Sequence, residues 1–475
     1  MKLIHQLKEK YRSFSAPVKA SFWALACSVF QSAFSLFTTP VFTRILSQEE
    51  YGVYDQYNTW LGILGIILTL NLSYETFLKG LADHKDDEDS YVSVIIGLDM
   101  AVFLFFFLLF LISPSFWGSL FKLSPLLTFL MFVHIFVSNP LDFWKSKERF
   151  HYRYIATTVV SVLLTVFSYA FSIYAVTHFN NRMEARIEAD LLVRVLIGLP
   201  ILVILLIQGK KIYDRKIWLS SLRFALPLLP HYLSNILLNS SDRLMIGRMV
   251  GDAQVAKYSI AYMIASMVLM ICSAVENSFV PYCFQKLKTK EYDSIRKNSR
   301  PLFICIALLC LGAMGLAPEV ITIFAGNRYA DAVPIVPTVS ASVYFIFVYT
   351  MFSNVEYHYS RTEYVGAATL AAAVLNIVLN WIMIPLFDYK IAGATTLISY
   401  IFLALTHYIS YRHIQKTEQF PGAYDLPLIF GIGAALTASA VLMNFIYPYM
   451  ILRWLIVMLS VAGAGVFYQR SRTRS

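Results

Sequence analysis

The feature that most constrains this chain is a series of apolar runs long enough to cross a lipid bilayer. Met100–Pro114 reads MAVFLFFFLLFLISP, and Leu191–Gln208 likewise has no face suited to water. Continuously apolar segments of about 20 residues predict transmembrane helices, because a helix satisfies its backbone hydrogen bonds internally. A strand of a membrane barrel would alternate apolar and polar residues instead. The sequence therefore predicts an all-α integral membrane protein.

Composition supports this class and excludes others. The 475 residues are 58% hydrophobic and 14% charged, whereas a soluble domain carries about a quarter charged residues. The five cysteines lie within or at the ends of apolar segments, without metal-ligand spacing, so no metal site and no cofactor is expected. The sequence has no P-loop and no serine–histidine constellation of recognisable spacing, which argues against an enzyme.

Fourteen spans can be drawn along the chain, which predicts a polytopic protein. They are 19–42, 56–78, 92–113, 120–140, 154–177, 190–207, 219–242, 255–281, 301–324, 334–358, 364–386, 391–411, 427–447 and 449–468. With the N-terminus inside, 28 of the 39 Lys and Arg residues fall on the inner side. Since Lys and Arg favour cytoplasmic loops, both termini are expected in the cytoplasm. The net charge of +10 then reflects orientation and contact with membrane lipid, and it is no argument for nucleic acid.

An internal repeat relates the two halves of the chain. A shift of 204 residues places Arg44 on Arg248 and Tyr54 on Tyr258. The same shift aligns three polar positions that share one helix face, which are Gln31 with Asn235, Ser35 with Asn239 and Thr38 with Asp242. In lipid, a polar face must look toward protein or water.

The repeat spans six helices, so the two copies have the same orientation in the membrane. We therefore expect two six-helix lobes, at 1–210 and 211–415, around a central cavity. The pair of helices and the tail at 416–475 are appended to them. Such an architecture suits transport by alternating access.

Three patches of sequence resemble a known family. The first span ends in P-x-x-T-R-I-L-S-x-E-E-Y-G-x-Y from Pro40 to Tyr54, which is similar to the polysaccharide flippases of the multidrug/oligosaccharidyl-lipid/polysaccharide exporter superfamily. Asp242 to Tyr258, and Ser278 to Pro281, resemble the second lobe of that family. The resemblance implies a flippase in the bacterial cytoplasmic membrane. Its cargo would be polyprenyl-pyrophosphate-linked oligosaccharide repeat units for O-antigen, capsule or exopolysaccharide. Partners of the polymerase and chain-length kind are implied by the family alone.

The residue chemistry fits a pyrophosphate cargo. Arginine binds phosphate through bidentate hydrogen bonds, and amides, imidazoles and phenols suit sugars. The candidate substrate-binding residues are Arg44, Arg248, Arg243, Arg194, His231, Gln31, Asn235 and Asn239, and the candidate sugar-stacking residues are Tyr54, Tyr57, Tyr258 and Tyr262. Structural alternatives stay open: Arg44 and Arg248 could snorkel to lipid headgroups, Arg243 could form an ion pair with its neighbour Asp242, and the tyrosines could be membrane-interface residues.

Four carboxylates at membrane depth are candidates for ion coupling, and they are Glu276, Glu75, Asp99 and Glu356. Glu75, Asp99 and Glu356 fall near the inner ends of their spans, where a solvated carboxylate is the simpler interpretation. Asn376 and Asn380, at i and i+4, predict a hydrogen-bonding pair between helices.

Two other functions compete with the flippase. A drug or organic-cation antiporter of the same superfamily would need an acidic, aromatic cavity with few arginines. A membrane polysaccharide polymerase or ligase would need longer outer loops than the predicted ones, such as 177–189 and 325–331.

Overall fold

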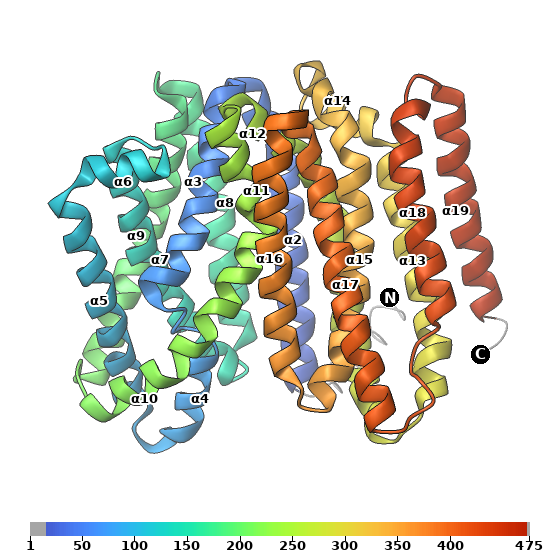
Figure 1. Ribbon diagram of the computed structural model, residues 1–475. Helices are drawn as coiled ribbons and strands as arrows, with labels where there is room; N and C mark the ends of the chain where they lie inside the picture. Colours follow the sequence, from blue (N-terminus) through green and yellow to red (C-terminus); the bar gives the residue numbers. More distant parts are fainter. Residues whose placement is uncertain (1–15, 473–475) are drawn as a thin grey trace, which may run out of the picture. The chain divides into compact units, whose positions relative to one another are not determined.

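Long helices form nearly all of the protein in the computed structural model, which describes residues 16–472 (Figure 1). Within this part of the chain every regular element is a helix, and fourteen of the helices have 21 residues or more. The prediction of an all-α polytopic protein with about fourteen long helices is confirmed.

Contacts divide the chain into two units, and each is described by itself. The first unit reaches to Glu50 and continues from Tyr57 to Leu233. Its long helices are α2 (Ala16–Ile45), α3 (Gln48–Thr69), α5 (Glu88–Ile112), α7 (Pro125–Phe150), α8 (Tyr154–His178) and α9 (Arg182–Gly209). Its short helices are α4 (Glu75–Asp83), η1 (Lys85–Asp87), α6 (Pro114–Phe121), α10 (Arg215–Ala225) and η2 (Leu226–Leu228).

The second unit contains Tyr51–Gln56, which is one segment of α3, and everything from Ser234 onward. Its long helices are α11 (Leu229–Met249), α12 (Asp252–Lys288), α13 (Tyr292–Gly315), α15 (Val336–His358), α16 (Thr362–Phe387), α17 (Ala392–Thr417), α18 (Leu426–Ile446) and α19 (Met450–Arg472). Its short helices are α14 (Ala317–Phe324), η3 (Asn327–Ile335) and η4 (Tyr389–Ile391).

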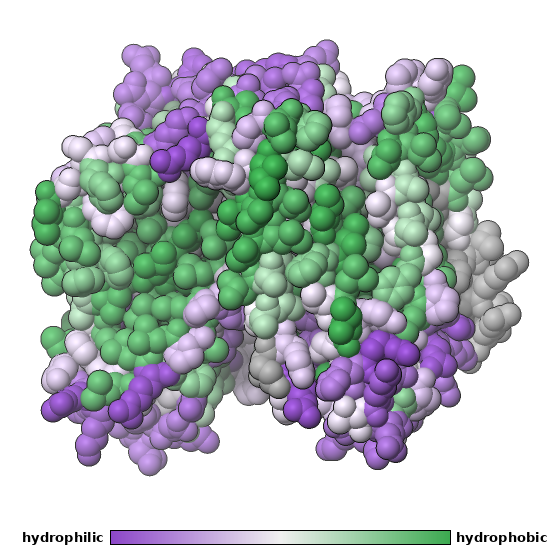
Figure 2. Space-filling view, viewed as in Figure 1, coloured by the Kyte–Doolittle hydropathy of each residue, from purple (hydrophilic) through white to green (hydrophobic). Residues whose placement is uncertain are grey.

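Eleven helices in the described residues are long and apolar enough to cross a membrane. Figure 2 shows hydrophobic residues over the middle of the helices and hydrophilic residues at their ends. The long helices α3 and α11 are not among the eleven. Both carry many polar residues, such as Asp55 and Gln56 on α3 and Asn239 and Asp242 on α11, which need protein partners in a bilayer.

Several predicted spans are broken into separate helices, and one of them is 56–78, which is divided between α3 and α4. The segment 219–242 contains most of α10, the turn η2 and the start of α11, because Pro227 has no amide hydrogen to continue the helix. Asp214 caps α10 by accepting hydrogen bonds from the backbone amides of Lys216 and Ile217. The hydrogen bond from Lys211, together with these amides, lowers the pKa of Asp214 to about 2. Similarly, 301–324 is divided between α13 and α14, next to Pro318.

One helix lies at the centre of each unit. In the second unit, α15 packs against α12, α13, α17 and α18, and most of its side chains are buried. In the first unit, α7 packs against α9, α4 and α5 and is also largely buried. Polar side chains on central helices are removed from both lipid and water, so they must find partners within their own unit.

Candidate functional site

The charged stretch after α2 has two different parts. Glu50 belongs to a capping box: its carboxylate accepts a hydrogen bond from the Ser47 amide at 2.7 Å, and its own amide donates to the Ser47 hydroxyl at 3.1 Å. Arg44, in the last turn of α2, is exposed and has no ionic or hydrogen-bonding partner among the described residues. Glu50 thus starts α3, whereas the Arg44 guanidinium is available to a ligand or to lipid.

Arg248 repeats the situation of Arg44. It lies in the last turn of α11, is exposed, and has no partner within residues 16–472. The two arginines aligned by the sequence repeat therefore share helix position, exposure and an uncommitted guanidinium.

Gln31 lines a small polar pocket in the first unit. Its amide donates to the Thr165 hydroxyl on α8 at 3.2 Å. The pocket has a volume of about 210 Å³ and is lined by Gln31, Arg149, Tyr154, Thr157, Thr158 and Ser161, together with small residues of α2. One guanidinium among hydroxyl groups is a suitable environment for a phosphate or for sugar hydroxyls.

Arg194 is already committed to protein partners. Its Nε donates to Asp190 Oδ2 at 2.9 Å, one turn away on α9. His134 on α7 brings its Nε2 to 3.7 Å from the same oxygen. The three side chains form a polar cluster, with one ion pair between Arg194 and Asp190, that ties α7 to α9.

Arg243 is also committed, and its close contacts are to residues other than its neighbour Asp242. The guanidinium lies 4.8 Å from the ring centre of Tyr262, and its Nε donates to the Ser259 hydroxyl at 3.1 Å. A second nitrogen donates to the Asn239 carbonyl at 3.3 Å.

Asp242 is the centre of a buried network in the second unit. Its side chain is 1% exposed, and it accepts hydrogen bonds from Tyr258 at 2.6 Å, from Thr396 at 2.7 Å and from Asn380. Asn380 also donates to Asn376 Oδ1 at 3.1 Å. The predicted hydrogen bonding of this asparagine pair between helices is confirmed, because it joins α16 to α11. By accepting these three hydrogen bonds, the Asp242 carboxylate ties α11 to α12, α16 and α17.

The remaining predicted polar residues lie in the first half of α11. Asn239 accepts a hydrogen bond from Tyr400 at 2.5 Å and donates to Asn235, which is exposed. His231 is half-buried and lies beside the ring of Tyr232. Asn235 is exposed, whereas His231 and Asn239 are half-buried.

The four candidate carboxylates differ sharply in environment. Glu75 is exposed at the start of α4, as expected, and accepts a hydrogen bond from Tyr232. Glu276 on α12 is half-buried. The expectation of solvated carboxylates is wrong for Asp99, which is 7% exposed, and for Glu356, which is fully buried. Both residues lie on faces of α5 and α15 that pack against other helices. Sequence periodicity alone does not show whether such a face contacts water or protein.

Three of the four predicted sugar-stacking tyrosines are buried. Tyr57 is 1% exposed, Tyr258 is fully buried and Tyr262 is 9% exposed, whereas Tyr54 is half-buried. The first three are packing residues in this structure, because their rings offer no open face to a sugar.

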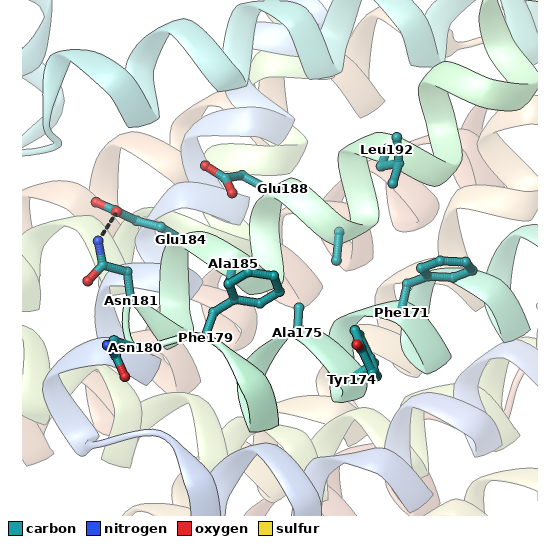
Figure 3. Close-up of a pocket in the computed structure, with 11 residues that line it drawn as sticks. Phe171, Tyr174, Ala175, Phe179, Asn180, Asn181, Glu184, Ala185, Glu188 and Leu192 are labelled. Carbon is teal, nitrogen blue, oxygen red and sulfur yellow. Dashed lines mark hydrogen bonds between the residues drawn. The ribbon is translucent and has the colours of Figure 1, made fainter.

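A larger pocket of about 720 Å³ lies between α8 and α9 (Figure 3). Phe171, Tyr174 and Phe179 line it together with Glu184 and Glu188, and no arginine is among its lining residues. Two carboxylates repel a pyrophosphate, so this pocket suits a cation.

Three residues were not predicted to act. They are Arg149 in the Gln31 pocket, Asp242 in the buried network of α11, and His407 on α17. A signal existed for Asp242, since it lies on the shared polar helix face of α11. Nothing in the local sequence pairs His407 with Glu356, 51 residues earlier.

Comparisons with known proteins agree on one superfamily. A family model described as "Polysaccharide biosynthesis protein" matches residues 18–287, and a second, MatE, matches residues 227–382. The chain is 23% identical over 164 residues to "Lsg locus putative protein 1" of Haemophilus influenzae, a match that spans 33% of this chain and 39% of that relative.

Two solved structures share the fold. The lipid II flippase MurJ in an inward closed conformation superimposes with a TM-score of 0.73 at 13% identity, over 95% of this chain and 99% of that one. An inward-facing multidrug resistance MATE family transporter gives 0.58 at 14% identity, over 82% and 95%. The family model covers more than half of the sequence, and the fold agrees with it. The chain therefore belongs to the polysaccharide biosynthesis protein family, and it shares its multi-pass helical fold with a lipid II flippase and with a multidrug resistance transporter.

Proposed function

We propose that this protein is a flippase for polyprenyl-pyrophosphate-linked oligosaccharides. It moves these repeat units from the inner to the outer leaflet of a bacterial cytoplasmic membrane by alternating access between lobes 1–210 and 211–415. Both termini are cytoplasmic, and the exported units feed an O-antigen, capsule or exopolysaccharide pathway with its polymerase and chain-length partners.

The observation that carries this proposal is the uncommitted state of Arg44 and Arg248. An exposed arginine at a membrane helix end that binds no protein carboxylate keeps its donors available for an anion, and pyrophosphate supplies two negative charges in a geometry that the guanidinium matches. Arg149 in the Gln31 pocket is a separate guanidinium, beside the first half of α2 and away from Arg44 in its last turn. Arg194 and Arg243 position helices instead, because their donors already have acceptors.

Membrane potential helps this transport. Moving one charge across 100 mV is worth about 2.3 kcal/mol, so two negative charges leaving an inside-negative cell gain about 4–5 kcal/mol. The proposed transport therefore needs no ATP. Ion coupling by Glu276, Glu75, Asp99 or Glu356 would add to this driving force.

The test is deletion of the gene, followed by mass spectrometry of membrane lipids. A flippase predicts accumulation of one polyprenyl-pyrophosphate oligosaccharide that glycosidase added outside the cells cannot reach. Wild type should clear the lipid, and an Arg44→Ala/Arg248→Ala double variant should not. The matched control is Arg223→Ala/Arg361→Ala, which removes two other exposed arginines and should clear it. Accumulation of a glycolipid already exposed outside would instead identify a polymerase or ligase.

One observation favours a second candidate function. The acidic, aromatic pocket between α8 and α9 suits an organic cation, as a drug antiporter would require. If no glycolipid accumulates, the antiporter hypothesis is tested next. It predicts that cells carrying the Glu184→Gln/Glu188→Gln variant retain more ethidium than cells carrying the wild-type protein.

A further inference from the structure

A polar pocket of about 310 Å³ lies at one end of the second unit. It is formed by the beginning of α13, the end of α17 and the loop 418–425 that leads into α18, at the lower end of α17 in Figure 1. Its charged lining residues are Arg296 and Arg300 on α13, Arg412 on α17, and Asp425. Three guanidinium groups against one carboxylate give the lining a net positive charge, so the pocket attracts anions.

The loop side of the pocket is held in place by Arg296. Its guanidinium donates to the carbonyl oxygens of Pro421 at 3.0 Å and Gly422 at 2.7 Å. Gly422 has a φ angle of 92°, a left-handed conformation that suits glycine. The other terminal nitrogen of Arg296 lies 3.3 Å from the carboxylate of Asp293, which is 89% exposed and outside the pocket lining. Arg296 therefore supports the loop as a fixed wall of the pocket.

The other two arginines differ in their partners. Arg300 Nε donates to Asp425 Oδ2 at 2.6 Å, so its charge is balanced by a lining carboxylate. Arg412 is half-buried, and it donates to the neutral side chain of Gln415 at 3.1 Å. No carboxylate among the described residues forms an ion pair with Arg412. The loop accounts for Arg296 and Arg300, whereas Arg412 brings a positive charge that the described chain does not balance.

An exposed apolar stripe leads along α17 to Arg412. Ile398, Leu405 and Ile409 are 43%, 42% and 65% exposed. Together with Arg412 they recur at intervals of seven, four and three residues, so they share one face of the helix. Helix α17 is one of those long and apolar enough to cross a membrane, and Arg412 lies near its end. The arginine thus lies at the level of lipid headgroups, above a surface suited to acyl chains.

We propose that this pocket binds the phosphate of an anionic glycerophospholipid, with Arg412 as the main donor and the acyl chains along the stripe from Ile398 to Ile409. Guanidinium groups bind phosphate through paired hydrogen bonds, and basic pockets between membrane helices at the cytoplasmic side suit such headgroups. With the proposed topology, this end of the unit faces the cytoplasm. A soluble phosphate would use the same guanidinium groups but would gain nothing from the apolar stripe. The lipid site does not depend on the identity of the transported cargo.

Lipid binding is tested by native mass spectrometry of the full-length protein in detergent with equal amounts of phosphatidylglycerol and phosphatidylcholine. Both lipids carry a phosphate, but only phosphatidylglycerol has a net negative charge, so wild type should retain it preferentially. Arg412→Gln should weaken the first binding event about 5- to 30-fold, because one charged contact at the membrane surface is lost. Arg412→Lys keeps the charge and should weaken it less. The matched control is Arg361→Gln, at an exposed arginine before α16 in the same unit, which should bind like wild type.

The apolar stripe is tested separately, so the proposal stays testable if Arg412→Gln does not fold. Ile409→Ser should also weaken binding of phosphatidylglycerol. Its matched control is Ile382→Ser on α16, where the side chain is 50% exposed, and this variant should bind like wild type. Thermal unfolding without added lipid shows which variants are folded. Phosphatidylglycerol should raise the apparent Tm of wild type more than that of Arg412→Gln, because the bound phosphate joins α13 to α17.

A competition experiment distinguishes a lipid from a soluble phosphate. Inorganic phosphate or glycerol phosphate at millimolar concentration should not displace phosphatidylglycerol from wild type. Displacement by either one would identify a soluble phosphate site and refute the lipid assignment. Equal retention of phosphatidylcholine and phosphatidylglycerol by wild type would overturn the proposal. So would equal binding by Arg412→Gln and Arg361→Gln, or by Ile409→Ser and Ile382→Ser.

Discussion

The Asp242 network makes a quantitative prediction about stability. Asp242→Ala removes the acceptor of three hydrogen bonds, which counted separately would suggest a loss of about 3–9 kcal/mol. The structure lowers this figure: Thr396 keeps a backbone carbonyl of its own helix at 2.8 Å, and Asn380 keeps Asn376 at 3.1 Å. Tyr258 loses its 2.6 Å bond and retains only the Thr396 hydroxyl at 3.3 Å. One donor is thus left nearly unsatisfied, and we expect a loss of about 1–3 kcal/mol in the free energy of unfolding.

Thermal unfolding of the purified protein in detergent measures this loss. For a cooperative unit of this size, about 1–3 kcal/mol lowers the apparent Tm by about 2–12 °C. The control is Asp331→Ala in the same unit, whose exposed carboxylate pairs with Lys257 at 2.7 Å and should cost less than about 1 kcal/mol. An Asp242→Ala variant as stable as wild type would refute the reasoning, since burial of the carboxylate would then cost as much as its hydrogen bonds contribute.

Two further predictions concern packing and a buried ion pair. Gly52→Val should lower the apparent Tm, because a Cβ on Gly52 would lie 1.8 Å from the carbonyl oxygen of Asp252. The control Gly65→Val should not lower it, because a Cβ there has no atom within 4 Å. Equal effects of the two variants on the Tm would contradict this prediction. Arg453 binds Glu319 through two hydrogen bonds of 2.7 and 2.9 Å. A double-mutant cycle of Arg453→Gln and Glu319→Gln should therefore give a coupling of about 1–3 kcal/mol, and additive effects would show that the pair is screened.

The fold class followed from the sequence because lipid imposes one dominant rule. A chain in hydrocarbon must close its backbone hydrogen bonds within each segment, so apolar length alone identifies helices. The ends of the helices were harder to predict from the sequence. Leu70 and Asn71 adopt positive φ angles after α3, and Pro227 separates α10 from α11. Apolar residues continue across these breaks, so a hydropathy profile predicts one span where the backbone forms two helices.

The candidate site was only partly predictable, and the reason is the range of the contacts. Asp190 and Arg194 are four residues apart on one helix, so their pairing could have been inferred from spacing. The bond between Asp242 and Thr396 joins residues 154 positions apart. Periodicity assigned Asp242 to a polar face but could not identify what that face would meet.

Whether an arginine already has a protein partner separates the candidate ligand-binding arginines from the structural ones. Arg194 could bind a phosphate only by leaving Asp190 beside His134, at the cost of a partly buried, underpaired carboxylate. Arg44 and Arg248 leave no protein carboxylate behind when they bind an anion. A guanidinium that exchanges only water or lipid for its cargo can also release that cargo, which a transporter must do in every cycle. The substrate-binding arginines of this protein are therefore expected among those that the folded chain leaves uncommitted.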